Sequence, residues 1–206
     1  MKRLAIFVSG GGTNLQQIAE YFAPNPEVKI VCVVSNNKDA FANVRAKNLG
    51  IPLVMLNSKA KIHDLELQSR YEVSKTFDFQ DVAFSEYLKS LEVDLIVLAG
   101  FLWLIPRHLL DAFDGKIINI HPALLPKYGG KGFYGHHVHE AVVAHHEKES
   151  GITIHYVNER YDSGDVIFQK SVTLSETDTA DDVAAKIHVL EKDYFPAVID
   201  ELLKSL

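Results

Sequence analysis

The chain has 206 residues, 47% of them hydrophobic, and a formal net charge of −6 at pH 7. This composition suits one core in a single domain, and the negative charge without a long basic run argues against a nucleic-acid partner. The first apolar stretch ends at Ser9 after about five residues, too few for a signal-peptide core or a membrane span. The single cysteine, Cys32, lies in an apolar run and is expected to be buried and reduced, which predicts a cytoplasmic protein.

Apolar runs alternate with amphipathic stretches along most of the chain, which is the pattern of a mostly parallel sheet with helices on both faces. The expected strands are 4–8, 29–34, 53–56, 95–99 and 117–121, and the expected helices are 14–22, 40–48, 79–91 and a short piece after Pro106. The order then changes, because only a turn-rich loop separates strands 151–157 and 166–172. The predicted fold class is α/β: a mostly parallel Rossmann-like sheet flanked by helices, with an antiparallel C-terminal strand region.

The last segment begins at Thr179, which is expected to be a helix N-cap because acidic residues follow in the first turn. The segment runs helically towards Pro196, which should kink or restart the helix. Two stretches resemble surface loops: 57–75, which is charged and weakly periodic, and 127–135, which is rich in glycine.

A glycine-rich segment, Ser9-Gly10-Gly11-Gly12-Thr13-Asn14, follows the first expected strand and opens a helix. Backbone amides at such a turn, together with a helix N-terminus, can bind an anion. The dinucleotide fingerprint requires a glycine at the position of Leu15. The nucleoside-triphosphate loop requires a lysine after its last glycine, and no lysine follows Gly12. The loop therefore suits a single phosphate better than NAD or ATP. A tight turn whose glycines serve only packing is an alternative of similar weight.

Asn119 and His121 end the strand 117–121 and are two residues apart, so a strand would place both side chains on one face. Pro122 closes the run, because proline cannot continue a central strand. In a parallel sheet, ligands bind beyond the carboxyl ends of the strands. An amide and an imidazole at that position can polarise a carbonyl and stabilise the oxyanion formed when it is attacked.

Asp162 is the candidate carboxylate for orienting His121. It stands in the loop between the last two strands, where an aspartate most often serves as a turn former. The strand before this loop carries His155 in an otherwise apolar setting, and the loop emerges at an end of the sheet. A carboxylate bonded to an imidazole keeps the ring protonated or correctly oriented, which favours Asp162 as the partner.

Ten histidines invite a metal hypothesis. Five of them are close in sequence: His136, His137, His139, His145 and His146. A structural zinc site prefers cysteines or a compact set of four ligands, and a catalytic one usually adds a carboxylate. We therefore expect no metal, and most of these residues to lie on an exposed or half-exposed helix.

The chain resembles the phosphoribosylglycinamide formyltransferases, purine-pathway enzymes that use 10-formyltetrahydrofolate, over nearly its whole length. The segments that carry the resemblance are Ser9 to Asn14, Leu98-Ala99-Gly100-Phe101, Asn119-Ile120-His121-Pro122-Ala123-Leu124-Leu125-Pro126, and Gly151-Ile152-Thr153-Ile154-His155-Tyr156-Val157 continuing through Asp162-Ser163-Gly164. Each segment alone is moderately specific, and four in the right order are strongly so.

The resemblance implies a catalytic trio of Asn119, His121 and Asp162 and small-molecule substrates, without metal, nucleic acid or membrane. The implied ribonucleotide-binding residues are Gly12, Thr13 and Asn14 for the phosphate, Glu191 for the ribose, and Pro122. The implied folate-binding residues are Phe101, Leu102, Trp103, Leu104, Ile105, Asn119 and Val157, with the loop 157–162. The expected organisation is one formyltransferase domain, 1–206, with a ribonucleotide-binding half (1–100) and a folate-binding and catalytic half (101–206), in a monomer or homodimer.

Three alternatives share part of this pattern. Methionyl-tRNA formyltransferases add a C-terminal domain and formyltetrahydrofolate deformylases add an N-terminal one, and the length and the glycine loop favour the ribonucleotide enzyme. A non-catalytic phosphate-binding module would explain the glycine loop but has no use for the trio. The chain departs from the family at Trp103 and Gln80, where familiar members carry arginines, and through an insertion at 131–135.

Overall fold

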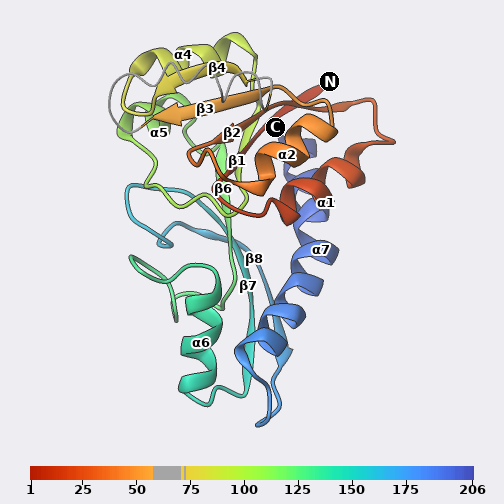
Figure 1. The fold of residues 1–206 in the computed structure, drawn as a ribbon, viewed down its shortest axis with the longest axis vertical. Helices are drawn as coiled ribbons and strands as arrows, with labels where there is room; N and C mark the ends of the chain where they lie inside the picture. Colours follow the sequence, from red (N-terminus) through yellow and green to blue (C-terminus); the bar gives the residue numbers. More distant parts are fainter. Residues whose placement is uncertain (58–70, 72) are drawn as a thin grey trace. The chain divides into compact units, whose positions relative to one another are not determined.

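The structure is a computed structural model that describes residues 1–57, 71 and 73–206. It divides into two compact units, residues 1–117 with residue 206, and residues 118–205 (Figure 1). The predicted single domain with halves divided at residue 100 stays a prediction.

The first unit is a parallel α/β layer, with strand order β4-β3-β2-β1-β5. Its strands are β1 (Lys2–Val8), β2 (Val28–Ser35), β3 (Leu53–Asn57), β4 (Val73–Asp78) and β5 (Leu95–Leu98). Its helices are α1 (Thr13–Phe22), α2 (Phe41–Asn48), α4 (Val82–Ser90) and α5 (Arg107–Ala112). Every residue from Leu4 to Val8 of the central strand is fully buried. A parallel strand with such an apolar run is covered on both faces.

Strand β4 corrects the predicted surface loop 57–75, because Val73–Lys75 already belong to it. Among the described residues it pairs with β3 alone, at the edge of the sheet. Ser74, Lys75 and Thr76 are exposed, so the strand has no apolar run that sequence reading could detect. The rest of the predicted loop, residues 58–70 and 72, lies outside the described residues.

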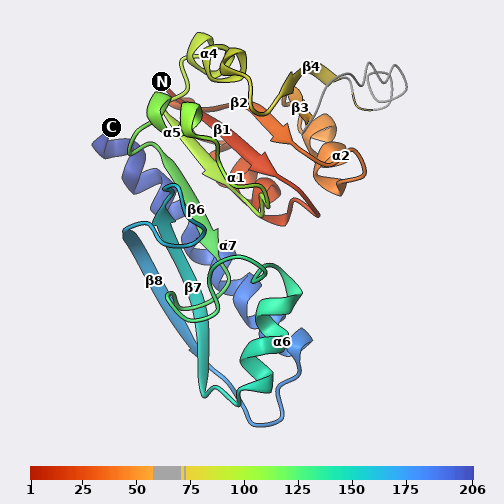
Figure 2. The ribbon, with the colours of Figure 1, turned by 90° about the vertical axis from the view of Figure 1, so that its left-hand side faces the viewer.

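The second unit contains the predicted antiparallel strands (Figure 2). Its elements are β6 (Ile117–His121), α6 (His136–Ala144), β7 (Glu149–Tyr156), β8 (Val166–Thr173) and α7 (Ala180–Ser205). Strand β7 pairs antiparallel with both β6 and β8. Together with the parallel strands of the first unit, this confirms the predicted fold class.

Helix α7 begins as predicted but does not restart at Pro196. Thr179 and Asp182 cap its first turn reciprocally, since each side chain accepts a hydrogen bond from the other's backbone N–H. The helix then continues through Pro196 to Ser205. Proline removes one helical hydrogen bond. Because Pro196 and the neighbouring Phe195 are both buried, packing holds the helix together at this point.

Cys32 is buried, as the sequence predicted, and burial raises the pKa of its thiol to about 12. Within the described part of the chain, no helix is both long enough and apolar enough to cross a membrane.

Candidate active site

Strand β6 brings Asn119 and His121 to its C-terminal end, and His121 is its last residue. The His121 side chain is buried, with 3% of the residue exposed, while Asn119 is half-buried. In the ladder with β7, Asn119 lies opposite His155 and His121 lies opposite Thr153. The antiparallel register therefore adds two polar side chains to the pair that the spacing predicted.

Asp162 joins this group from the loop between β7 and β8. Its backbone has a φ of +49°, a conformation that aspartate tolerates better than most residues. Its Oδ2 accepts a hydrogen bond of 2.8 Å from the backbone N–H of Gly130. Two residues on, a Cβ at Gly164 would lie 1.7 Å from the carbonyl oxygen of Tyr156, so only glycine fits there. Local backbone geometry thus fixes where the carboxylate points.

His121 has an acceptor at each ring nitrogen. Its Nε2 lies 2.7 Å from the carbonyl oxygen of Tyr128, and its Nδ1 lies 3.4 Å from Oδ1 of Asp162. A carbonyl oxygen can only accept, so Nε2 carries a proton and donates it. A protonated Nδ1 would make the second contact favourable as well. The His121 ring is therefore held between a backbone carbonyl and a carboxylate, which fixes its orientation.

The Asp162 carboxyl is strongly biased towards its ionised form. Burial acts to raise its pKa, but contacts with His121 and His155 and the N–H of Gly130 outweigh burial and hold the pKa well below its usual range. The side chain is 11% exposed, so water offers little screening of these contacts. Asp162 is consequently a fixed negative charge beside His121.

His155 is a member of this cluster that sequence reasoning used only as support for Asp162. Its Nε2 lies 3.1 Å from Nδ2 of Asn119, and its Nδ1 lies 2.8 Å from the carbonyl oxygen of Tyr156. The Nε2 of the same ring also lies 3.7 Å from Oδ1 of Asp162. Asn119 Nδ2 also lies 3.5 Å from Oδ1 of Asp162. His155 therefore sets the orientation of the Asn119 amide.

His121 presents one hydrogen-bond donor, at Nε2, to an acceptor position. The carbonyl oxygen of Tyr128 lies where an oxyanion stabilised by Nε2 of His121 would lie. Tyr128 has a φ of +56°, and the next residue is Gly129, where a Cβ would lie 2.4 Å from Cδ2 of Leu125. The arrangement can thus stabilise negative charge on a carbonyl oxygen, provided that this oxygen replaces that of Tyr128.

The glycine loop lies in the first unit, between β1 and α1. Gly12 is the N-cap of α1, with a φ of +73°, and no side chain caps the helix. A Cβ on Gly12 would lie 2.7 Å from Cβ of Ala42, so the loop packs directly on α2. Thr13 is exposed in the first turn, and Oδ1 of Asn14 is buried without a hydrogen-bond partner among the described residues. The loop can therefore accept an anion, and its position after β1 agrees with the prediction.

The segment predicted to bind folate also lies in the first unit, after β5. Phe101 and Ile105 are buried, whereas Leu102 and Leu104 are 46% and 42% exposed. The backbone N–H of Leu102 donates to Oγ of Ser9 over 2.9 Å, which ties the segment to the glycine loop. Trp103 packs against Phe79 and Phe101. The segment therefore offers two apolar side chains to a ligand while its other members anchor it.

The remaining predicted residues lie in the second unit. Pro122 follows β6, and Val157 follows β7. Glu191 is on α7 and is 7% exposed, and its Oε2 accepts a hydrogen bond of 3.0 Å from Nδ1 of His188. Glu191 is thus a buried carboxylate with one side-chain donor.

The five histidines between residues 136 and 146 differ in their exposure to solvent. His136 and His137 on α6 are exposed, as are His145 and His146 after it, which confirms the expectation for most of the five, while His139 is only 4% exposed. Its Nδ1 has no hydrogen-bond partner among the described residues. Over residues 1–57, 71 and 73–206, no group of three or more histidine, cysteine or acidic residues has the geometry of a metal site.

His139 should make the protein less stable in mild acid. Burial, and then the charge of His188, lower the pKa of His139 to about 4. Between pH 6.5 and about 4 the unfolded chain binds a proton there that the folded chain does not, so stability falls as the pH falls. We expect His139→Gln to reduce this slope by up to about 1.4 kcal/mol per pH unit, measured by urea unfolding at several pH values. The exposed His137→Gln is the control, and equal slopes in both variants would contradict this assignment.

Comparison with known proteins agrees with this geometry. The family model for formyl transferases matches residues 2–199. The chain therefore belongs to the formyl transferase family.

Several proteins similar to this chain carry the name of one enzyme within the formyl transferase family. Proteins named phosphoribosylglycinamide formyltransferase include one from Haemophilus influenzae, 38% identical over 97% of this chain and 86% of that protein, and one from Bacillus subtilis, 36% identical over 98% and 95%. A chloroplastic one from Vigna unguiculata is 40% identical over 99% of this chain, which spans 62% of its length. The crystal structure of phosphoribosylglycinamide formyltransferase from Bacillus halodurans matches with a TM-score of 0.80 and 33% identity, covering 98% of this chain and 95% of that one.

Proposed function

We propose that this chain transfers a formyl group from 10-formyltetrahydrofolate to the amine of glycinamide ribonucleotide, a step of purine biosynthesis. The observation that carries the proposal is the group formed by Asn119, His121 and Asp162, with Nδ1 of His121 3.4 Å from the carboxylate. The names of the full-length relatives support the choice of substrates.

In the proposed reaction, the amine nitrogen attacks the formyl carbon and the carbonyl oxygen becomes an oxyanion. His121 and Asn119 donate hydrogen bonds to this oxygen, and Asp162 keeps the His121 ring oriented and charged. The attacking nitrogen then loses a proton, the folate nitrogen accepts one, and the carbon–nitrogen bond to the folate breaks. Asp162 assists this proton transfer through water.

The proposed reaction requires local rearrangements at Asn119, whose amide N–H must turn from His155 or Asp162 to the formyl oxygen, and at Tyr128. The N–H at Nε2 of His121 donates to the carbonyl of Tyr128, so the formyl oxygen must take the place of that carbonyl. Three glycines with a positive φ, Gly130, Gly132 and Gly135, follow Tyr128 in the sequence. Such residues can absorb a change in backbone direction at little cost. We therefore infer that the segment 127–135 moves when the formyl donor binds.

The binding roles implied by the family are part of the proposal. Gly12, Thr13 and Asn14 bind the phosphate, Glu191 binds the ribose hydroxyls, and Pro122 also contacts the ribonucleotide. The folate ring contacts Val157, Asn119 and the segment from Phe101 to Ile105, in which Leu102 and Leu104 expose apolar side chains. A cytoplasmic location and a monomeric or homodimeric state remain predictions.

A substitution in the glycine loop tests the phosphate role. Gly12→Ala adds a Cβ that would lie 2.7 Å from Ala42, at a φ of +73° that alanine rarely adopts. The loop must shift, so we expect the KM for glycinamide ribonucleotide to rise about tenfold or more, with a smaller change in kcat. Gly10→Ala is the matched control, because its Cβ would meet no atom within 4 Å. Equal KM values for the two variants would refute the role of Gly12.

The decisive experiment is an assay of the purified chain with 10-formyltetrahydrofolate and three acceptors offered in parallel: glycinamide ribonucleotide, methionyl-tRNA and water. The expected result is formylation of the ribonucleotide only. Release of formate without the ribonucleotide would indicate a deformylase, and binding without turnover would indicate a phosphate-binding module.

A further inference from the structure

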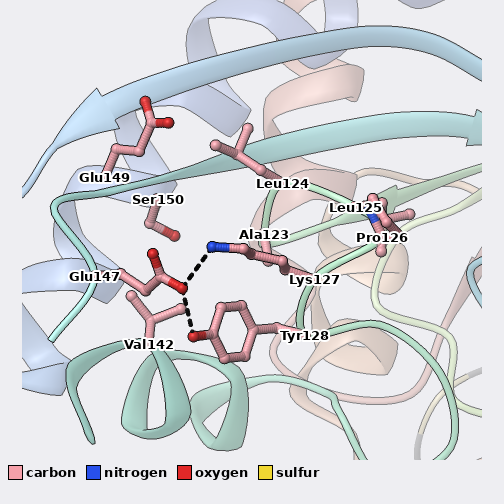
Figure 3. Close-up of a pocket in the computed structure, with 10 residues that line it drawn as sticks. All are labelled: Ala123, Leu124, Leu125, Pro126, Lys127, Tyr128, Val142, Glu147, Glu149 and Ser150. Atoms are coloured by element: carbon pink, nitrogen blue, oxygen red, sulfur yellow. Dashed lines mark hydrogen bonds and ion pairs between the residues drawn. The ribbon is translucent and has the colours of Figure 1, made fainter. Parts of the chain in front are cut away.

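A cavity of about 280 Å³ lies in the second unit, beside the segment that follows β6 (Figure 3). Its lining residues are Ala123, Leu124, Leu125, Pro126, Lys127, Tyr128, Val142, Glu147, Glu149 and Ser150. Its volume is near the lower end of the range for small-molecule sites. None of these side chains has a role in the proposed reaction, so the cavity needs a separate explanation.

Ser150 is the first sign of a polar occupant. The residue is only 3% exposed, and its Oγ has no hydrogen-bond partner among the described residues. Burying a hydroxyl without a partner costs free energy, and native proteins rarely do so. The next residues on the same face of β7, Ile152 and Ile154, are fully buried and apolar. A hydroxyl at the cavity end of this face therefore indicates that something polar is bound there.

Glu147 is the second sign. Lys127 Nζ and the Tyr128 hydroxyl both donate to its Oε1, each over 2.9 Å. These hydrogen bonds from Lys127 and Tyr128 lower the pKa of Glu147, so the group is ionised at neutral pH. Its second oxygen, Oε2, points to the side on which Ser150 lies in Figure 3. A charged acceptor and an unpaired hydroxyl thus line the same cavity.

The charges and the apolar walls specify the chemistry of the occupant. The charged groups at the cavity are the ion pair of Glu147 and Lys127, because Glu149, next to Ser150 on β7, directs its carboxylate away from them in Figure 3. The side chain of Lys127 is 67% exposed, so the cavity is open to solvent on that side. Both hydrogen bonds to Glu147 go to Oε1, and a carboxylate oxygen such as Oε2 accepts more strongly from a charged donor than from a neutral one, which favours a cation. Leu124, Leu125 and Val142 provide apolar contacts for a compact body.

We propose that this cavity binds a small organic amine. The ammonium group of the ligand donates to Oε2 of Glu147 and to Oγ of Ser150, and its apolar part packs against Leu124, Leu125 and Val142. The site satisfies the unpaired hydroxyl, and it shares with the proposed reaction the segment at Lys127 and Tyr128.

The test is a titration of the full chain with benzylamine, followed by two-dimensional amide NMR in the absence of both proposed substrates. The expected result is saturable shifts of the backbone amides of 123–125, 127–128, 142 and 147–150. Benzoate and benzyl alcohol, which keep the ring but not the positive charge, should bind at least about tenfold more weakly. Because no turnover is measured, the outcome is independent of whether the proposed reaction is correct.

Three variants separate a built site from general attraction. Glu147→Gln keeps an acceptor for Tyr128 but removes the charge and should weaken benzylamine at least about tenfold, and Ser150→Ala should weaken it severalfold. Glu176→Gln is the control, because Glu176 pairs with Lys148 Nζ over 2.7 Å outside the cavity. Unsaturable shifts, equal binding of benzoate, or an equal loss of affinity in Glu176→Gln would overturn the proposal.

Discussion

His121→Ala is expected to lower kcat for formyl transfer by about 10²–10³-fold, because it removes the donor aimed at the developing oxyanion. The affinity for glycinamide ribonucleotide should stay nearly unchanged, since His121 acts on the formyl oxygen and not on the ribonucleotide. The variant also leaves the Asp162 carboxylate without the imidazole ring beside it. Steady-state kinetics and equilibrium binding on the same preparation would separate these effects.

The control for His121→Ala is His137→Ala. The His137 side chain is 62% exposed, and its Nδ1 pairs with Oε2 of Glu140 on the same helix. Its removal should leave kcat within about twofold of the wild type, as for most surface substitutions. A rate for His121→Ala within severalfold of the wild type would show that His121 does not stabilise the transition state.

The sequence predicted that Asn119 and His121 lie together at a strand end, because strand periodicity is a local property. Asn119 and His121 share a face in any strand, and Pro122 places them at its end. Asp162 was harder to assign, since its distance from His121 depends on antiparallel pairing and on the backbone conformation of the loop. His155 lies beside Asn119 because the register of β6 and β7 places the two residues opposite each other. The spacing of residues within one strand does not reveal this register, so the sequence could not predict the contact.

Other features had no detectable sequence signal. The acceptor at Nε2 of His121 is a backbone carbonyl, which every residue possesses, so nothing in the side chain of Tyr128 indicates its role. Strand β4 is an exposed edge strand without apolar alternation. Helix α7 continues through Pro196 because buried packing outweighs the preference of proline to end a helix. Tertiary contacts decided each of these outcomes.

Asp162→Asn is expected to lower kcat by about 10²–10⁴-fold with little change in the size of the side chain. The amide can still accept from the N–H of Gly130, but it carries no charge to attract the ring of His121. The ring would then be oriented less firmly, so its Nε2–H would be aimed less well at the oxyanion. A kcat close to that of the wild type would remove Asp162 from the proposed mechanism.

The pH dependence of stability tests the same carboxylate independently of catalysis. The folded-state pKa of Asp162 is below its unfolded value, so its contribution to stability is present above the unfolded pKa of about 4 and is lost as the pH falls through the folded pKa. The free energy of unfolding of Asp162→Asn should therefore be lower than that of the wild type at neutral pH, and the difference should shrink below about pH 4. Urea unfolding at neutral and acid pH measures this difference. A difference that does not change with pH would mean that Asp162 acts only through its shape, and the loss of rate in Asp162→Asn would then need another cause than the lost charge.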